Sequence, residues 1–185
     1  MDKRSAILQA ATRLMVTEGL KKVTHRHVAA VAGVPVGSIG YYYSSRERLI
    51  EVCLAEIQSQ RVSLLARGTA AVSGDATAEE LADLFIDSLT LRNPADLGGY
   101  VLLSIDAARE EHDSAASGAS ATAQTRVAEL VELGDELLAA AQRPGVNARR
   151  LLEVVIGAVI VSSHLGEDPR ATARAALVDA LGAHA

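Results

Sequence analysis

Apolar residues recur at helical spacing through most of the chain, beginning with residues 4–17. This segment carries the i, i+3, i+4, i+7 pattern that places side chains on one face of an α-helix, in Ile7, Ala10, Ala11 and Leu14. A second helix is expected to begin at Thr24, a residue type that favours the N-cap, and to end at Gly33. A very short third helix follows, and a long fourth helix begins after the serine pair 44–45.

The remainder of the chain also reads as helical. A Gly/Ser/Asp break at 71–77 is a candidate domain boundary. One face of the fourth helix begins apolar and turns polar, as in a helix that bridges two domains. We assign this bridging helix to the second domain and expect domains at 1–46 and 47–185. Five further helices are predicted, at about 77–92, 96–113, 119–142, 147–166 and 168–183. The pattern predicts an all-α protein of about nine helices.

Composition agrees with this class. The chain is 49% apolar but only 3% aromatic and contains four prolines. Its core is therefore expected to consist of Leu, Val, Ile and Ala, and scarce proline favours helices. No apolar run is long enough for a membrane span, and the basic start lacks a signal-like apolar stretch, so a cytoplasmic protein is expected. The single cysteine, Cys53, lies in an apolar helical run and is expected to be a small buried side chain.

The net charge of −5 is unevenly distributed. Residues 1–50 contain eight Lys/Arg and three acidic residues, a balance of +5, whereas residues 51–185 contain ten Lys/Arg and twenty acidic residues, a balance of −10. Such asymmetry favours a basic module that faces a polyanion, joined to an acidic module with another role.

The second and third helices have the features of a helix-turn-helix. Gly33 lies in the turn, where a positive φ is expected, and Ala29 is small where the two helix backbones must approach closely. Val28, Val34 and Ile39 are expected to form the apolar wedge that fixes the crossing angle of the two helices. Any helical hairpin needs a small residue and a turn glycine, so the polar residues on these helices decide between a structural and a DNA-binding motif.

Three consecutive tyrosines end the third helix. Successive helical residues point about 100° apart, so the three rings cannot all enter one core. Tyr43 shares the inner face with Ile39 and is expected to be buried, while Tyr41 points outward and Tyr42 lies at the flank. Their hydroxyls can bond phosphate oxygens, as can the free amides at the Thr24 helix start. The arrangement favours DNA as the polyanion.

These residues resemble the N-terminal DNA-binding domain of the TetR family of transcriptional regulators over positions 4–50. The family shows a pattern T-x-R-x-h-A-x-x-A-G-V and then S-x-G-x-h-Y-x-x-F-x-x-K-x-x-L. It is matched here by Thr24, Arg26, Val28, Ala29, Ala32, Gly33, Val34, Gly37, Ile39, Tyr43 in place of Phe, Arg46 in place of Lys, and Leu49. The rest of the chain resembles the family in length and helix content.

The resemblance implies a homodimer that places one recognition helix of each subunit in the major groove of a palindromic operator. It also implies a C-terminal domain that holds a small-molecule effector and dimerises through its last two long helices. Thr24, Tyr41, Tyr42 and Arg46 would then contact phosphates, and Arg26, Val36, Gly37 and Ser38 would face base edges. His25 joins the DNA-binding residues through its place directly after the helix start.

The chain departs from the family pattern at three positions of the third helix. Pro35, Val36 and Gly40 replace the usual serine, basic residue and tyrosine. Pro35 suits a first helical position, because its missing N–H is not needed there. Base reading by the short helix is therefore expected to be mostly apolar, with Arg26 giving the main hydrogen bonds to guanine.

In the acidic module, the candidate effector-binding residues are those with polar or bulky side chains on its apolar helices: Phe85, Leu89, Tyr100, Leu103, Ser104, His112, Ser163 and His164. Each also has a plain structural interpretation as core or solvated surface. The helix at 147–166 is apolar nearly all round and, with 119–142, is expected to form the dimer. Small and branched residues there mark the interface: Val154, Gly157, Ala158 and Val161.

Two other functions fit the sequence less well. An all-α small-molecule-binding protein or enzyme lacks support, because the sequence contains no catalytic motif, and His25 and His27 point to different sides of their helix. A constitutive DNA-binding protein would not need the long C-terminal part. We expect a bacterial ligand-responsive regulator, most often a repressor in this family, with no enzyme activity, cofactor or metal.

Overall fold

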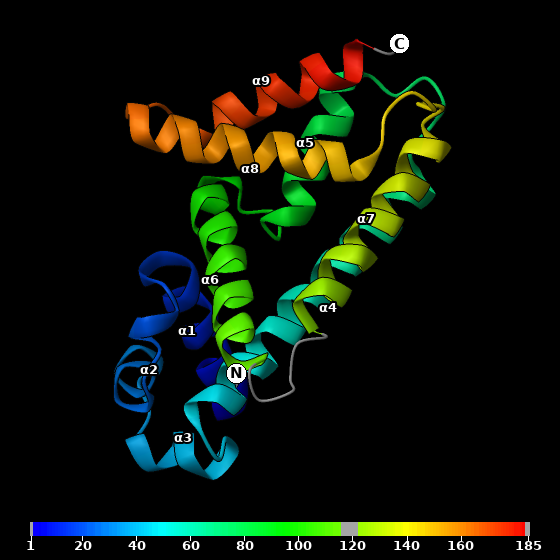
Figure 1. Ribbon diagram of the computed structural model, residues 1–185. Helices are drawn as coiled ribbons and strands as arrows, with labels where there is room; N and C mark the ends of the chain where they lie inside the picture. Colours follow the sequence, from blue (N-terminus) through cyan, green and yellow to red (C-terminus); the bar gives the residue numbers. More distant parts are fainter. Residues whose placement is uncertain (1, 116–121, 184–185) are drawn as a thin grey trace.

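The computed structural model describes residues 2–115 and 122–183, and for 111–115 and 122–123 it describes the backbone alone. Within these ranges the protein consists of helices and turns, with no β-strand (Figure 1). The all-α class and the estimate of nine helices are confirmed for these ranges. The elements are α1 (Lys3–Glu18), η1 (Leu20–Lys22), α2 (His25–Ala32), α3 (Val36–Tyr42), α4 (Arg46–Ala71), α5 (Ala78–Leu89), η2 (Pro94–Asp96), α6 (Leu97–Ala115), α7 (Thr122–Ala140), α8 (Ala148–Leu165) and α9 (Pro169–Gly182), where η marks a short 3-10 helix.

The helices α1, α2 and α3 form a headpiece around a small apolar core. The stripe predicted on the first helix is buried, and it faces the inner residues of α2 and α3. Asp2 caps α1, because its carboxylate accepts a hydrogen bond from the Ser5 amide at 2.8 Å. The helix ends at Gly19, whose φ of 84° turns the chain into η1.

The long helix α4 leaves the headpiece and runs beside α7 (Figure 1). Of the serine pair, Ser45 is the cap: its hydroxyl accepts a hydrogen bond from the Arg48 amide at 3.1 Å. Cys53 is fully buried on this helix, and burial raises the pKa of its thiol to about 11. It therefore remains a neutral, small side chain, as the sequence predicts.

A second apolar core holds the C-terminal helices together. The helices α8 and α9 lie side by side, and α5 packs against α9 beneath them (Figure 1). A capping box starts α5: the Thr77 hydroxyl accepts from the Glu80 amide, and the Glu80 carboxylate accepts from the Thr77 amide. None of the helices that the structure describes is long and apolar enough to cross a membrane.

The helix α6 joins the two cores. Tyr100, Leu103 and Ala107 of α6 belong to the same buried cluster as the headpiece residues, and α6 packs on α1 (Figure 1). The approach is closest at Gly99, where an added Cβ would lie closer than 3.0 Å to the backbone carbonyl oxygen of Val16. Only glycine therefore permits this contact.

A first prediction tests the contact between α6 and α1. Replacing Gly99 with Ala forces the two helix backbones apart, and we expect the free energy of unfolding to fall by about 1–3 kcal/mol, the usual cost of overpacking. Urea denaturation followed by circular dichroism measures the change. The neighbouring Gly98→Ala is the matched control, because its Cβ meets no atom within 4 Å. That variant is expected to gain up to about 1 kcal/mol from better helix propensity. Equal changes in the free energy of unfolding for the two variants would contradict the close contact of α6 with α1 at Gly99.

Candidate DNA-binding surface

The turn between α2 and α3 is a Schellman motif. Gly33 adopts the left-handed conformation with φ 66° and ψ 33°. Its amide donates to the carbonyl oxygen of Ala30 at 3.4 Å, and the Val34 amide donates to that of Ala29 at 3.0 Å. Val28, Ala29 and Ile39 are buried against each other and α1. The helix-turn-helix expected from the sequence is therefore present.

The start of each helix in the motif is fixed by a different device. The Thr24 hydroxyl caps α2 by accepting a hydrogen bond from the His27 amide at 3.2 Å. Pro35 was expected to be the first helical residue of α3. It is instead the N-cap of α3, with an extended ψ, and the helix begins at Val36. The reason is that the ring fixes φ but leaves ψ free, so proline also fits the residue before the helix.

The three tyrosines divide as the sequence predicts. Tyr43 is 3% exposed and lies in the headpiece core, where burial raises the pKa of its phenol. Tyr41 is 84% exposed and Tyr42 is 40% exposed. Their rings meet edge to face with centroids 5.1 Å apart. The outer pair therefore offers two hydroxyls on one side of α3.

Four other predicted DNA-binding residues lie on α2 and α3. Val36 and Gly37 are exposed in the first turn of α3, and Ser38 is half-buried. Arg26 is exposed at the start of α2 and forms no hydrogen bond or ion pair with a described residue. The base-reading candidates therefore lie on both helices of the motif, and Arg26, Val36 and Gly37 are exposed.

The two histidines of α2 have separate environments. The His27 ring contacts the Lys22 carbonyl oxygen at 3.2 Å and Glu18 at 3.9 Å. His25 is half-buried, and its Nε2 has no hydrogen-bond partner in the structure. Among the side chains that the structure describes, no group of three or more His, Cys, Asp or Glu could hold a metal ion.

Arg46 is engaged within the protein. Its Nε donates to the Val23 carbonyl oxygen at 2.9 Å, and its Nη2 donates to that of Leu20 at 2.7 Å. Nη2 also lies 3.6 Å from Glu110 of α6. Arg46 thus ties the start of α4 to η1 and reaches toward α6, which the sequence alone did not indicate.

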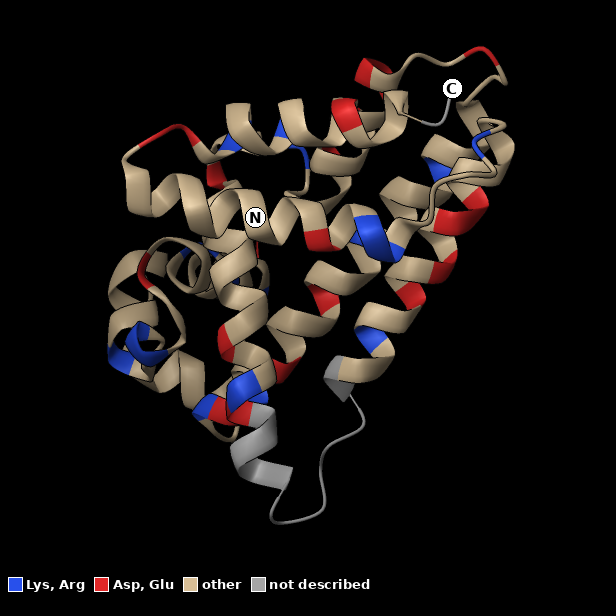
Figure 2. Ribbon diagram, turned by 45° about the horizontal axis from the view of Figure 1, so that its top comes forward, with Lys and Arg blue, Asp and Glu red and all other residues tan. Residues whose placement is uncertain are grey.

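The headpiece carries more basic than acidic residues, and the helices that follow carry more acidic than basic residues. Lys21 and Lys22 are exposed in η1 beside the start of α2. The acidic residues are spread over the helices that follow the headpiece (Figure 2). The headpiece therefore carries the cations that a phosphate backbone requires.

The predicted effector-binding residues are not gathered around one hollow. Phe85 and Leu89 lie in the C-terminal core, and Tyr100 and Leu103 lie in the core shared with the headpiece. Three serine and histidine candidates are exposed and bond their own helix: Ser104 to the Tyr100 carbonyl oxygen, Ser163 to that of Val159, and His164 to that of Ile160. His112 lies outside the described side chains.

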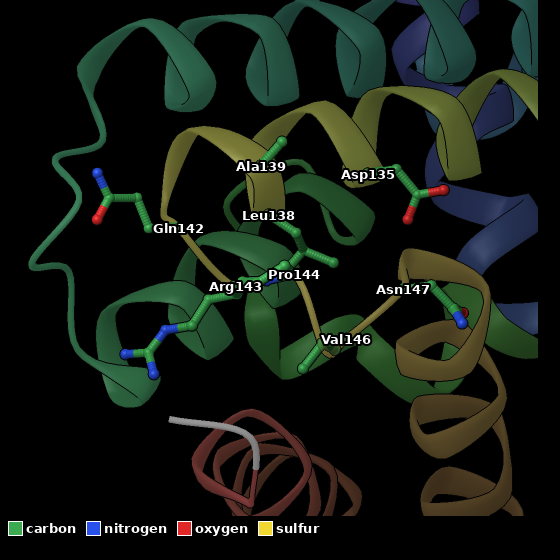
Figure 3. Close-up of a pocket in the computed structure, with 8 residues that line it drawn as sticks. All are labelled: Asp135, Leu138, Ala139, Gln142, Arg143, Pro144, Val146 and Asn147. Carbon is green, nitrogen blue, oxygen red and sulfur yellow. The ribbon is translucent and has the colours of Figure 1, made fainter.

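Two open hollows lie elsewhere in the C-terminal part. One of about 640 Å³ lies at the end of α7 and the following loop, lined by Asp135, Leu138, Ala139, Gln142, Arg143, Pro144, Val146 and Asn147 (Figure 3). In it, Asp135 accepts a hydrogen bond from the Ala148 amide, and Arg143 donates to the Ala76 carbonyl oxygen. A smaller hollow of about 290 Å³ lies between α4 and α5. Neither is lined by a predicted effector residue.

One face of α8 exposes apolar side chains. Of the four predicted interface residues, Gly157 and Val161 are exposed, whereas Val154 and Ala158 are half-buried against the core. The same helix also exposes Ile156, Ile160 and Leu165. An added Cβ at Gly157 meets no atom within 4 Å. The face is therefore open in the single chain.

Arg61 of α4 is a polar residue that the sequence analysis missed. It is buried on the stripe that also contains Ile57 and Leu65, four residues before and after it. That spacing was the available signal, because a charged residue at i+4 from one apolar core residue and i−4 from another faces the interior.

Residues 7–53 match the family model described as bacterial regulatory proteins, tetR family. No curated protein matches the sequence. Among solved structures, a protein described as a TetR-family transcriptional regulator from Rhodococcus sp. is 17% identical, with a TM-score of 0.59 over 100% of this chain and 99% of that one. The multidrug-binding protein EbrR, solved with imidazole, is 24% identical, with a TM-score of 0.56 over 97% and 94%.

A protein described as a transcriptional regulator from Streptomyces coelicolor A3(2) is 22% identical, with a TM-score of 0.56 over 97% of this chain and 98% of that one. At these identities the likeness establishes a shared fold over nearly the whole length of each chain. The family model adds the identity of the helix-turn-helix region.

A second prediction concerns Arg46. In Arg46→Met the carbonyl oxygens of Val23 and Leu20 lose their charged donor, and we expect the free energy of unfolding to fall by about 1.5–3 kcal/mol. Arg48→Met is the control, because Arg48 is exposed and pairs only with Glu51 at i+3, which is worth less than about 0.5 kcal/mol. Chemical denaturation of both variants measures the difference. A loss no larger than that of the control would show that the two bonds do not hold the headpiece.

Proposed function

We propose that the chain, whose residues 7–53 match the tetR family model, is a transcriptional regulator that binds a palindromic operator as a homodimer and is released by a small-molecule effector. The observation that carries the proposal is the surface of the helix-turn-helix. There, Arg26, Val36 and the hydroxyls of Tyr41 and Tyr42 face outward, while the inner residues of the same helices are buried. In our proposal residues 1–46 are the DNA-binding domain and 47–185 the effector and dimer domain.

The proposed contacts divide into two kinds. Thr24, His25, Tyr41 and Tyr42 bind phosphates, and they set the position of the protein on the duplex. Arg26 reads guanine from the first turn of α2, while Val36, Gly37 and Ser38 approach base edges from α3. Arg46 keeps its two carbonyl bonds within the headpiece and would contact phosphate through Nη1, which donates to no carbonyl oxygen of a described residue.

The proposed regulation is repression without catalysis. Regulators of this family are generally transcription factors that carry out no reaction. EbrR, a multidrug-binding protein of the same fold, supports a small-molecule effector for this chain. The protein would act in the bacterial cytoplasm, where it meets chromosomal DNA.

The proposed dimer uses the exposed face of α8. Ile156, Ile160, Val161 and Leu165 leave an apolar surface uncovered in the single chain. Gly157 lies within this surface and permits close approach of another helix. A two-fold axis through this face would pair it with its own copy, as most homodimers do.

A third prediction tests base reading. Duplexes selected from a random pool by the wild-type protein are titrated by fluorescence anisotropy. We expect binding that weakens at least tenfold between 50 and 200 mM salt. Arg26→Met is expected to lose about 5- to 150-fold in affinity for the selected duplex, since one bidentate base contact is worth about 1–3 kcal/mol. Arg67→Met, an exposed change on α4, serves as control and should match the wild type. Absence of salt-sensitive binding to any duplex would contradict the proposed function.

A fourth prediction tests the dimer. Gly157→Glu places a charge on the α8 face without touching its own subunit, so the chain should fold but sediment as a monomer and lose operator affinity. Gly98→Glu introduces the same charge on α6, where the new Cβ is also unobstructed, and should remain a dimer. Analytical ultracentrifugation at micromolar concentration distinguishes them. An intact Gly157→Glu dimer would place the interface elsewhere.

A further inference from the structure

Arg61 carries a charge in the interior of the C-terminal part. The residue is 9% exposed, although it lies at the middle of α4. Its Nε donates to the Leu89 carbonyl oxygen at the end of α5, at 3.0 Å. Its guanidinium carbon lies over the ring of Tyr100 of α6, 5.4 Å from the centroid. Three helices therefore meet at this one cation.

The charge of Arg61 is only partly compensated. Its two Nη nitrogens donate to no described residue, and no described carboxylate forms an ion pair with it. Burial, together with a smaller repulsion from Arg126 of α7, lowers the pKa of the guanidinium to about 10. The group nevertheless remains charged at neutral pH. A buried cation without a counter-ion is costly, and proteins normally pair such groups.

A purely structural role accounts poorly for this arrangement. The Leu89 carbonyl lies at the negative end of the α5 dipole, which favours a cation by at most about 2 kcal/mol. The contact with Tyr100 adds about 2 kcal/mol when desolvated. Methionine or leucine would fill the same stripe between Ile57 and Leu65 without burying a charge, often at no loss of stability.

Two of the residues expected to bind the effector touch Arg61. Leu89 provides the carbonyl oxygen, and Tyr100 provides the ring. The phenol of Tyr100 also has no described hydrogen-bond partner, and its surroundings are apolar enough to raise its pKa. A guanidinium fork above an aromatic ring, in an aliphatic interior, matches a carboxylate attached to an apolar body.

We propose that Arg61 is the anion-binding residue of the effector site, and that the effector is an organic acid whose carboxylate accepts hydrogen bonds from the Arg61 Nη atoms. This inference rests on the proposed effector response and names its chemical class. The apolar body of the acid packs beside Tyr100. Because Tyr100 follows Gly99 and shares the core of the headpiece, an acid bound there acts on α6 where α6 meets α1.

The test uses matched pairs of acids and amides, which differ in charge but little in shape. The probes are hexanoate, decanoate, benzoate and phenylacetate, each beside its neutral primary amide. Thermal unfolding of the full chain is followed by circular dichroism. We expect at least one acid to raise the Tm by about 5 °C at a concentration near 100 times its Kd, while its amide does not. If none of the four acids raises the Tm more than its amide, the inference is overturned.

Variants assign the effect to Arg61. Arg61→Met should fold with an unchanged or higher Tm and lose the response to the acid. Arg67→Met, an exposed arginine on the same helix, should keep the response. Arg61→Lys retains the charge without the planar fork and should bind the acid at least tenfold more weakly by calorimetry, which provides a second measurement if the methionine variant does not fold. An unchanged acid affinity in Arg61→Lys or an unchanged response in Arg61→Met would refute the assignment.

The failure of this inference can be told apart from failure of the proposed function. Titration of the selected duplex is repeated with and without the active acid. Since coupling between two sites is reciprocal, the acid should weaken duplex binding by the factor by which the duplex weakens acid binding. Duplex binding without any response to acids overturns the anionic effector alone, whereas absence of duplex binding overturns the regulator itself.

Discussion

The contact of α6 with α1 is the constraint on which the rest of this structure depends. Gly99 allows the helix backbones to meet, and the next residue, Tyr100, enters the core of the headpiece. The headpiece and the C-terminal helices therefore cannot reorient independently without opening a buried surface. Packed interfaces of this kind shift between discrete arrangements and do not deform smoothly, which suits the proposed response to an effector bound at a distance.

Within the headpiece, the same two short helices supply both the core and the outer surface. The Schellman turn at Gly33 fixes the angle between α2 and α3, so the side chains that are not needed for packing project together. Arg46 joins the start of α4 to η1 through its hydrogen bonds to the carbonyl oxygens of Val23 and Leu20. The exposed tyrosines are thus carried on a helix whose packing is fixed by the buried Ile39 and Tyr43. A preorganised surface of this kind loses less entropy when it binds DNA.

The sequence predicted the headpiece well because its signals are local. A cap at Thr24, a left-handed glycine at 33 and the i, i+4 relation of Ile39 to Tyr43 each depend on neighbours within one or two turns. The prediction that Pro35 is the first helical residue of α3 was wrong by one position, because proline is compatible with both the N-cap and the first helical position.

The C-terminal part was predicted less well because its side-chain contacts join distant helices. On α8, which is apolar nearly all round, periodicity cannot tell the inner Val155 and Val159 from the outer Ile156 and Ile160. Ser163 and His164 proved to be exposed near the end of α8. Arg61 was overlooked because arginine is usually on the surface, and its burial depends on how α4, α5 and α6 meet.

Amide hydrogen exchange of the chain with and without its selected duplex tests the central claim most directly. The account predicts that DNA slows exchange at the first amides of α2, in residues 25–27, and throughout residues 36–42. The protection should fade as salt is raised, and the C-terminal helices should not gain protection from direct contact. Unchanged exchange in both headpiece segments, or protection confined to the helices after α4, would contradict it.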